Sequence, residues 1–235
     1  MLLRLYACIM ALMTLTACVD GTLPFNFPFD AKPVMNRLNS DLKTSEVYVG
    51  DPVFIRIFKE EHILELWMKS QGANRYKLVK SYPICRWSGQ LGPKYIEGDR
   101  QAPEGFYSTN LLSLNPNSRY HLSFNVNYPN EYDRQYGRTG SFIMVHGDCV
   151  SEGCYAMTDR GIEEIYILVE SALGAGQQEI PVHIFPFRMT PARMMSVANS
   201  PNYPFWKNLR EGYNYFESRG YPPRWNVNYG EYDFY

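Results

Sequence analysis

The chain has 235 residues and a formal net charge of −1, from 23 basic and 24 acidic side chains. Apolar residues make up 45% and charged residues 20%, which excludes intrinsic disorder for most of the chain. The balanced charge argues against a nucleic-acid-binding protein, because such a protein needs a basic excess to displace phosphate counterions. An aromatic content of 15%, with 17 Gly and 16 Pro, favours a β-rich, loop-rich fold over a helical bundle.

Residues 1–17 carry one positive charge, at Arg4, followed by an apolar stretch that is short for a membrane span and typical of a secretory signal peptide. The stretch ends in the letters LTAC, with Cys18 last, which resembles the lipobox of bacterial lipoproteins. In that class the signal is cut before the Cys and the thiol carries a lipid. The alternative is an ordinary signal peptide with an incidental Cys. Because Val19 rather than Asp follows, the resemblance implies a periplasm-facing protein that is lipid-anchored to the outer membrane.

Residues 18–46 are proline-containing with little periodicity, so we interpret them as a tether with a short helix near 35–42. From residue 53 the pattern becomes that of strands, and residues 85–105 form a long Gly/Pro loop of the kind that lines sites. The predicted strands are Val53–Phe58, Ile63–Met68, 76–84, 120–126 and 141–145.

A helical period follows, with Thr158 or Asp159 as its N-cap and Gly174 at its end. Ile180–Phe185 is predicted as a further strand, at a sheet edge because it contains Pro181. Further helices are expected near 191–198 and 204–217, and an aromatic tail from 221 to 235 shows no clear element. The pattern predicts one α+β domain.

The candidate catalytic residues lie in one stretch, residues 142–157, with the sequence FIMVHGDCVSEGCYAM. A strand delivers His146, a turn follows, and Gly153 and Cys154 precede a helix. A Cys nucleophile needs a base to hold its proton, and His146 is that candidate, oriented by the carbonyl of Gly147. Gly153 allows close backbone approach, so the N–H groups of Gly153 and Cys154 are candidate donors to an oxyanion.

Two other interpretations of these residues stay open. In the first, His146 is a histidine of the core and Cys154 is a buried thiol without a catalytic role. In the second, His146, Asp148, Cys149 and Cys154 bind zinc, although the usual Cys-x-x-Cys spacing is absent. If Cys18 is lipidated, three thiols remain in an oxidising compartment, which suggests one pair and one working thiol. Cys85 and Cys149 are then either a disulfide that braces the turn or two buried thiols.

The pair His146-Gly147 followed by Ser151-x-Gly153-Cys154 resembles the active-site motif of the L,D-transpeptidase (YkuD) family of cell-wall enzymes. The letters APEGFY at 102–107 resemble the Thr-Pro-x-Gly-x-Phe stretch of that family. The resemblance implies a β-rich L,D-transpeptidase (YkuD-like) α+β fold with a few flanking helices, Cys154 as nucleophile, His146 as base, and backbone support from Gly147, Gly153 and Ser151. It implies no cofactor and no metal.

Two departures from the family motif are Glu152, where a second His is usual, and a link of only three residues, 148–150, between the His-Gly pair and the Ser. With the phrases YPICRWSGQLGPKYIEGD and IMVHGDCVSEGCYAMTDRGIEEIY, they resemble a narrower branch, the diaminopimelic acid–protein amidases. That branch detaches Braun-type lipoprotein from peptidoglycan. The implied partners are peptidoglycan stem peptides, the linked lipoprotein and a membrane surface.

The rival functions are an L,D-transpeptidase that makes crosslinks or attaches lipoprotein, and a non-catalytic wall-binding lipoprotein. The implied organisation is a signal peptide at 1–17, a tether at 18–46, a catalytic domain at 47–187 and a helical, aromatic C-terminal extension at 188–235. Basic residues near the glycine loops are candidates to bind stem-peptide carboxylates, and one tyrosine is a candidate to line the groove. These candidate substrate-binding residues are Arg86, Lys94, Arg138 and Tyr107.

Overall fold

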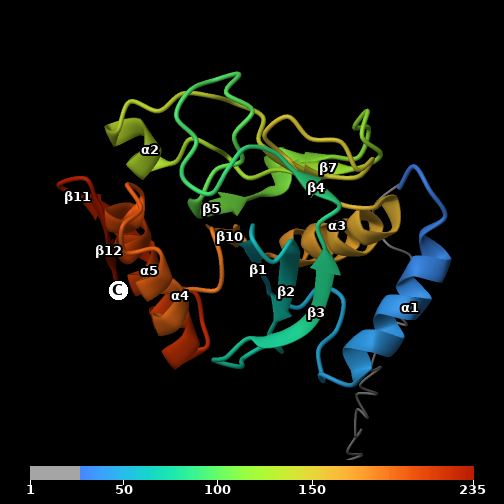
Figure 1. Cartoon of the computed structure of the whole chain (residues 1–235). Helices are drawn as coiled ribbons and strands as arrows, with labels where there is room; N and C mark the ends of the chain where they lie inside the picture. The colour runs from blue at the N-terminus through green and yellow to red at the C-terminus, as the bar shows by residue number, and fades with distance from the viewer. Residues whose placement is uncertain (1–26) are drawn as a thin grey trace, which may run out of the picture.

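The computed structural model describes residues 27–235 (Figure 1), so the expected signal peptide and the expected lipidation site at Cys18 lie outside the described residues. Two five-stranded mixed sheets and a terminal hairpin make up its β structure. Sheet A has the order β3-β2-β1-β10-β5 and sheet B the order β4-β9-β8-β7-β6. No helix within 27–235 is long and apolar enough to cross a bilayer.

The elements of sheet A are β1 (Val53–Phe58), β2 (Ile63–Met68), β3 (Lys77–Pro83), β5 (Gly105–Thr109) and β10 (Ile180–Phe185). Those of sheet B are β4 (Arg86–Trp87), β6 (Leu114–Asn115), β7 (Ser123–Asn125), β8 (Met144–His146) and β9 (Tyr155–Ala156). The helices are α1 (Ala31–Lys43), α2 (Glu131–Gln135), α3 (Asp159–Gly174), α4 (Pro191–Ser196) and α5 (Tyr203–Arg219), with the 3-10 turn η1 (Leu111–Ser113) and the hairpin β11 (Trp225–Asn228) and β12 (Glu231–Phe234).

Strand β1 is buried along its whole length because sheet A is covered on both faces. Its residues Val53, Ile55 and Ile57 belong to the main core, which also contains α3. Phe58 belongs to a second cluster with the C-terminal helices, and Phe54 packs against Phe216 of α5 at 4.9 Å between ring centroids. The C-terminal segment is therefore one of the layers that bury the central sheet.

Helix α3 contacts both sheets, because it touches β1 of sheet A and β7 and β8 of sheet B (Figure 1). Its buried residues lie on nearly every side, as expected for a helix between two layers. Thr158 caps its N-terminus by accepting from the N–H of Gly161, and the helix ends at Gly174. The predicted bounds of this helix are confirmed, and the turn that precedes it is anchored to a rigid element.

Helix α1 shows that part of the expected tether is folded. Val34, Leu38 and Leu42 are buried in the main core, four or fewer residues apart on one face. The helix expected near 35–42 is therefore present and longer. The predicted boundary of the catalytic domain at residue 47 stays a prediction, and α1, which precedes that residue, packs into the main core.

Two expectations about the later elements are wrong. Strand β10 is not an edge strand, since it lies between β1 and β5. Pro181 is tolerated there because pairing with β1 begins only at Val182, while Pro181 faces Ser108 of β5. The tail, for which no element was expected, forms the hairpin β11–β12 around Tyr229 and Gly230, both with positive φ, which is the geometry of a two-residue hairpin turn.

The remaining differences from the predicted elements are smaller. The strand expected at 120–126 is only β7, and the one expected at 141–145 is displaced to β8. Strand β5 and helix α2 were not predicted. The capping box of α2, in which Asn130 and Asp133 satisfy each other's backbone N–H groups, was a readable signal for it.

Candidate active site

Strands β8 and β9 bring Cys154 and His146 to one face of sheet B. The two strands are parallel, with Val145 opposite Tyr155 and His146 opposite Ala156. Continuing this register places Cys154 opposite Met144, and the N–H of Met144 lies 3.4 Å from the Cys154 Sγ. Because side chains alternate along a strand, Cys154 and His146 share a face, diagonal neighbours about 8 Å apart at Cα by strand geometry.

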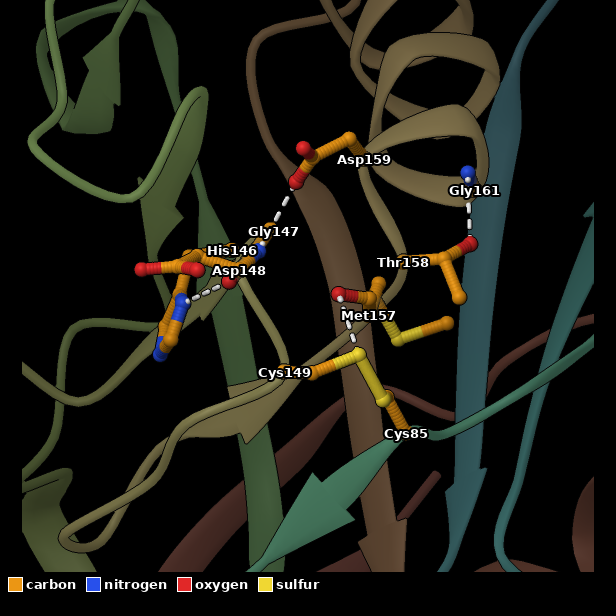
Figure 2. The surroundings of a disulfide bond; sticks show 9 residues. All are labelled: Cys85, His146, Gly147, Asp148, Cys149, Met157, Thr158, Asp159 and Gly161. Carbon is orange, nitrogen blue, oxygen red and sulfur yellow. Dashed lines mark hydrogen bonds between the residues drawn. A yellow bond between two sulfur atoms is a disulfide. The ribbon is translucent and has the colours of Figure 1, made fainter.

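His146 is 2% exposed, and its Nδ1 lies 2.6 Å from the carbonyl oxygen of Gly147 (Figure 2). A carbonyl only accepts, so Nδ1 carries the proton and Nε2 of the neutral ring is left with its lone pair. The ring of Tyr120 packs over the imidazole at 4.6 Å between centroids. The orienting role expected for the Gly147 carbonyl is confirmed in geometry.

Burial lowers the pKa of His146, although its bond to Gly147 and the charge of Asp148 pull that pKa upward. Burial also raises the pKa of the Cys154 thiol, opposed by the Met144 N–H and the Lys94 charge. The first direction favours a neutral imidazole and the second a neutral thiol.

The carbonyl of Phe142 also lies against the thiol, 3.6 Å from the Cys154 Sγ. Phe142 has a φ of 53°, an uncommon conformation for a bulky residue, and its side chain is 72% exposed. Strained backbone of this kind concentrates at functional sites. No sequence signal pointed to Phe142.

The expected backbone supports, Gly147, Gly153 and Ser151, make close contacts around the turn. A Cβ on Gly147 would lie 2.6 Å from Asp159 Oδ1 and 3.0 Å from the Tyr120 carbonyl, so this position admits only glycine. Gly153 has a φ of 122°, and its N–H donates to Ser151 Oγ at 3.3 Å. Ser151 Oγ in turn donates to the Cys154 carbonyl at 2.7 Å. The Gly153 N–H is thus already engaged, and an oxyanion would have to displace Ser151 to use it.

A disulfide between Cys85 and Cys149 ties the turn after Gly147 to the start of β4 (Figure 2). Asp148 and Cys149 both have positive φ, a costly conformation for non-glycine residues, and the N–H of Asp148 donates to Asp159 at 2.9 Å. The disulfide resolves the open alternative of two buried thiols. The disulfide also takes the Cys149 sulfur out of the ligand set that the zinc interpretation needs.

The four candidate substrate-binding residues differ in exposure, since Arg86 is exposed and the other three are buried. Arg86 is exposed on β4, opposite Ala156, and so shares the face of Cys154 and His146. Lys94 is 3% exposed and is occupied by Asp99 and by the Ile96 carbonyl. Of the four candidates, Arg86 alone keeps a free, exposed charge on the site's face.

Tyr107 was expected to line the substrate groove and Arg138 to bind carboxylates of the stem peptide, but both side chains are buried. Tyr107 is 4% exposed and donates to Asp133 at 2.9 Å, and Arg138 bonds the other oxygen of the same carboxylate at 2.8 Å. The Arg138 guanidinium also packs against aromatic rings, which are those of Tyr95, Tyr132, Tyr136 and Phe205. Both residues hold the interior together and offer nothing to a ligand.

Sequence reasoning missed the ion pair that shapes the 85–105 loop. Lys59 and Glu104 are fully buried and 2.9 Å apart. Lys59 also donates to the loop carbonyls of Gln90 and Ala102, and Glu104 accepts from Trp206 of α5 at 2.8 Å. Glu104 is part of the APEGFY segment at residues 102–107, but the sequence does not show that its partner is Lys59.

Comparison with known proteins agrees with this architecture. Residues 52–184 match the family model YkuD, the L,D-transpeptidase catalytic domain. The chain belongs to the L,D-transpeptidase family. It is 44% identical over 230 residues, covering 98% of this chain and 90% of the relative, to the protein named "Putative L,D-transpeptidase YafK" of Escherichia coli strain K12, and equally to that of strain O157:H7. The family acts on peptidoglycan, so this chain is a peptidoglycan-related protein of an enzyme family.

Among solved structures, the chain is similar to the helical cell shape determining protein Pgp2 of Campylobacter jejuni, with 22% identity and a TM-score of 0.44. That likeness covers 63% of this chain and 54% of Pgp2. Bd1075 of Bdellovibrio bacteriovorus is similar at 21% identity and a TM-score of 0.41, over 73% of this chain and 60% of that one. The predicted α+β, YkuD-like fold is confirmed by the family match.

The pKa directions give a testable alkylation profile. Iodoacetamide should modify Cys154 in the non-reduced protein and leave Cys85 and Cys149 unmodified, because these two are in the disulfide. Since burial raises the pKa of the Cys154 thiol above its ordinary value, the thiolate fraction and the alkylation rate should be low near neutral pH and increase across the alkaline range. Peptide mapping after timed alkylation between pH 6 and pH 10 measures this. A rate that is already constant near neutral pH would show a resting ion pair instead.

Proposed function

We propose that this chain is a cysteine amidase that cleaves the link between diaminopimelate of peptidoglycan and the terminal lysine of an outer-membrane lipoprotein. The observation that carries the proposal is a free thiol, Cys154, on the same sheet face as an imidazole whose Nε2 lone pair is fixed by the Gly147 carbonyl. Family membership supplies the substrate class. The short link of three residues, 148–150, supports attack of water rather than of a second amine on the thioester.

The proposed acylation half uses these groups in order. His146 Nε2 takes the proton of the Cys154 thiol as Sγ attacks the carbonyl carbon at the L-centre of diaminopimelate. The tetrahedral oxyanion collapses, the carbon–nitrogen bond breaks, and the imidazolium gives its proton to the leaving lysine amine. The product is a thioester on Cys154 and a released lipoprotein.

The deacylation half returns the enzyme to its starting state. His146 takes a proton from water, and the hydroxide attacks the thioester carbon. The carbon–sulfur bond breaks, the imidazolium reprotonates Sγ, and the stem peptide leaves with a new carboxylate. A neutral His146 in the resting enzyme suits both acylation and deacylation, because its Nε2 must first accept a proton and then donate it.

Hydrolysis rather than crosslinking is supported by the short link between the His-Gly pair and Ser151. Only Asp148, Cys149 and Val150 lie there, with Val150 45% exposed and the turn held by the disulfide. A longer segment would shape an amine-acceptor site and limit water. An acceptor amine must compete with bulk water by positioning alone, and a short link supplies little of it.

Muropeptide analysis of cells that overproduce the protein tests this proposal against transpeptidation. We expect fewer stems that carry the lipoprotein remnant and no rise in crosslinks between two diaminopimelates, both dependent on Cys154. A Cys154-dependent rise in those crosslinks would make the chain a transpeptidase. No change in either class would favour a non-catalytic wall-binding lipoprotein.

We also propose that the protein faces the periplasm, anchored to the outer membrane through a lipid on Cys18. The LTAC letters at 15–18 support this. Growth with labelled palmitate should label the wild-type protein and not Cys18→Ser, because residues 15–18 are the acylation signal that the sequence shows and Cys18 is its acceptor. Equal labelling of both proteins would mean that the anchor is elsewhere, and density-gradient separation of membranes then locates the wild type.

A further inference from the structure

A single peptide group connects the imidazole of the candidate active site to helix α3. Its carbonyl, which belongs to Gly147, lies 2.6 Å from His146 Nδ1. Its N–H, which belongs to Asp148, donates to Asp159 Oδ1 at 2.9 Å (Figure 2). The carbonyl and the N–H of a planar trans peptide point in opposite directions. The group therefore lies between the imidazole and the carboxylate and forms a hydrogen bond with each of them.

The turn that contains this peptide needs to be held in place. Asp148 has a φ of 64° and Cys149 a φ of 37°, which non-glycine residues seldom adopt. The disulfide at Cys149 ties down the next side chain but makes no bond to this peptide. Among residues 27–235, Asp159 is the one acceptor for the Asp148 N–H. Without that bond the peptide can rotate and turn its carbonyl away from His146.

The close approach of the Asp159 carboxylate depends on the glycine at position 147. A Cβ on Gly147 would lie 2.6 Å from Asp159 Oδ1, which is closer than Cβ atoms approach other heavy atoms in proteins. Asp159 is the first residue of α3, and this helix packs against both sheets. The carboxylate therefore holds the turn from a rigid element.

We propose that Asp159 is a positioning residue for His146 and acts through the peptide group between Gly147 and Asp148. Its carboxylate fixes the plane of that group, and the charge-assisted bond makes the carbonyl oxygen a stronger acceptor for the Nδ1 proton. The imidazole is thereby kept with its proton on Nδ1 and its lone pair on Nε2. This role rests on the proposed amidase function, in which that lone pair takes the proton of Cys154.

Two variants of Asp159 test the hydrogen bond. Asp159→Ala removes the acceptor, whereas Asp159→Asn keeps an oxygen for the Asp148 N–H. For release of lipoprotein from sacculi, Asp159→Ala should lower kcat about tenfold, the equivalent of one hydrogen bond, and leave KM nearly unchanged. Asp159→Asn should lower kcat by no more than about threefold, because only the charge of the acceptor is lost.

The matched control is Asp30→Ala. Asp30 is also an exposed aspartate at the N-terminus of a helix, α1, and its side chain accepts one backbone N–H, that of Lys32, at 3.1 Å. The two alanine variants lose the same kind of bond, so we expect similar small decreases in melting temperature. Only Asp159→Ala should lose kcat.

Nitrogen-15 NMR of the imidazole gives a second readout, which does not depend on turnover. The His146 signals are assigned by their loss in His146→Gln. At a pH where the ring is neutral, the wild type should show a protonated Nδ1 and a bare Nε2. In Asp159→Ala the two chemical shifts should move toward each other as both tautomers become populated. Asp159→Asn and Asp30→Ala should keep the wild-type pattern.

Wild-type kcat in Asp159→Ala would overturn the inference, as would a loss in Asp159→Asn as large as in the alanine variant. An imidazole spectrum that does not change in Asp159→Ala would overturn it as well, whatever the kinetics. Failure of the proposed function gives a different result, because wild-type protein then releases no lipoprotein. The imidazole spectra still decide in that case whether Asp159 positions His146.

Discussion

Cys154→Ala should abolish release of lipoprotein from sacculi, with a loss of at least about 10⁴-fold in turnover, because no other group among the described residues replaces the attacking sulfur. The Cys154 side chain is half-buried, and its replacement by a smaller apolar group removes two weak contacts to backbone atoms of Met144 and Phe142. We therefore expect the free energy of unfolding to change by no more than about 1 kcal/mol. Mass spectrometry of the soluble fraction and urea denaturation measure the two quantities.

The control for this prediction is Cys154→Ser, which keeps a similar shape and a hydroxyl. It should be inactive as well, since a hydroxyl is a far weaker acid than a thiol and the neutral His146 is a modest base. Release at the wild-type rate by the alanine variant would remove Cys154 from the mechanism. A variant that is inactive but unfolded would decide nothing, which is why stability is measured in the same preparation.

Lys59→Met should destabilise the protein by about 3–5 kcal/mol, the largest effect that we expect from any single change outside the site. It leaves the Glu104 carboxylate in a fully buried position with no cation. Burial lowers the pKa of Lys59, and the charge and hydrogen bond of Glu104 oppose that lowering. The carbonyls of Gln90 and Ala102 also lose their donor, so the 85–105 loop loses its fixed shape.

The matched control is an exposed ion pair. Arg193 and Glu60 are 2.5 Å apart with 30% and 40% of their side chains exposed, so Arg193→Met should cost less than about 1 kcal/mol. The double variant Lys59→Met with Glu104→Gln should recover part of the loss, because no uncompensated charge stays buried. A loss below about 1 kcal/mol for Lys59→Met alone would contradict the account of the ion pair.

The elements that could be predicted from sequence are those with a local signal. Strands β1, β2 and β10 and helix α3 have clear periodicity and end signals, and their predicted bounds agree with the structure. The residues His146 and Cys154 were found because the motif is continuous in the chain. Their common face depends on the pairing of β8 with β9, which spans only ten residues.

What sequence could not predict depends on contacts between distant segments. Tyr107 and Arg138 read as possible ligand contacts, but Asp133 pairs with both and withdraws them into the interior. Pro181 suggested an edge, and only the register with β1 shows why a central strand accepts it.

The fate of the thioester is the central claim, and oxygen labelling tests it most directly. Purified protein is incubated in H₂¹⁸O with sacculi that carry the bound lipoprotein, and the stem peptides are then analysed by mass spectrometry. Hydrolysis predicts one ¹⁸O atom in the diaminopimelate carboxylate of each stem that has lost its lipoprotein, dependent on Cys154. Lipoprotein release without the label, with the stem instead joined to a second amine, would contradict the amidase account.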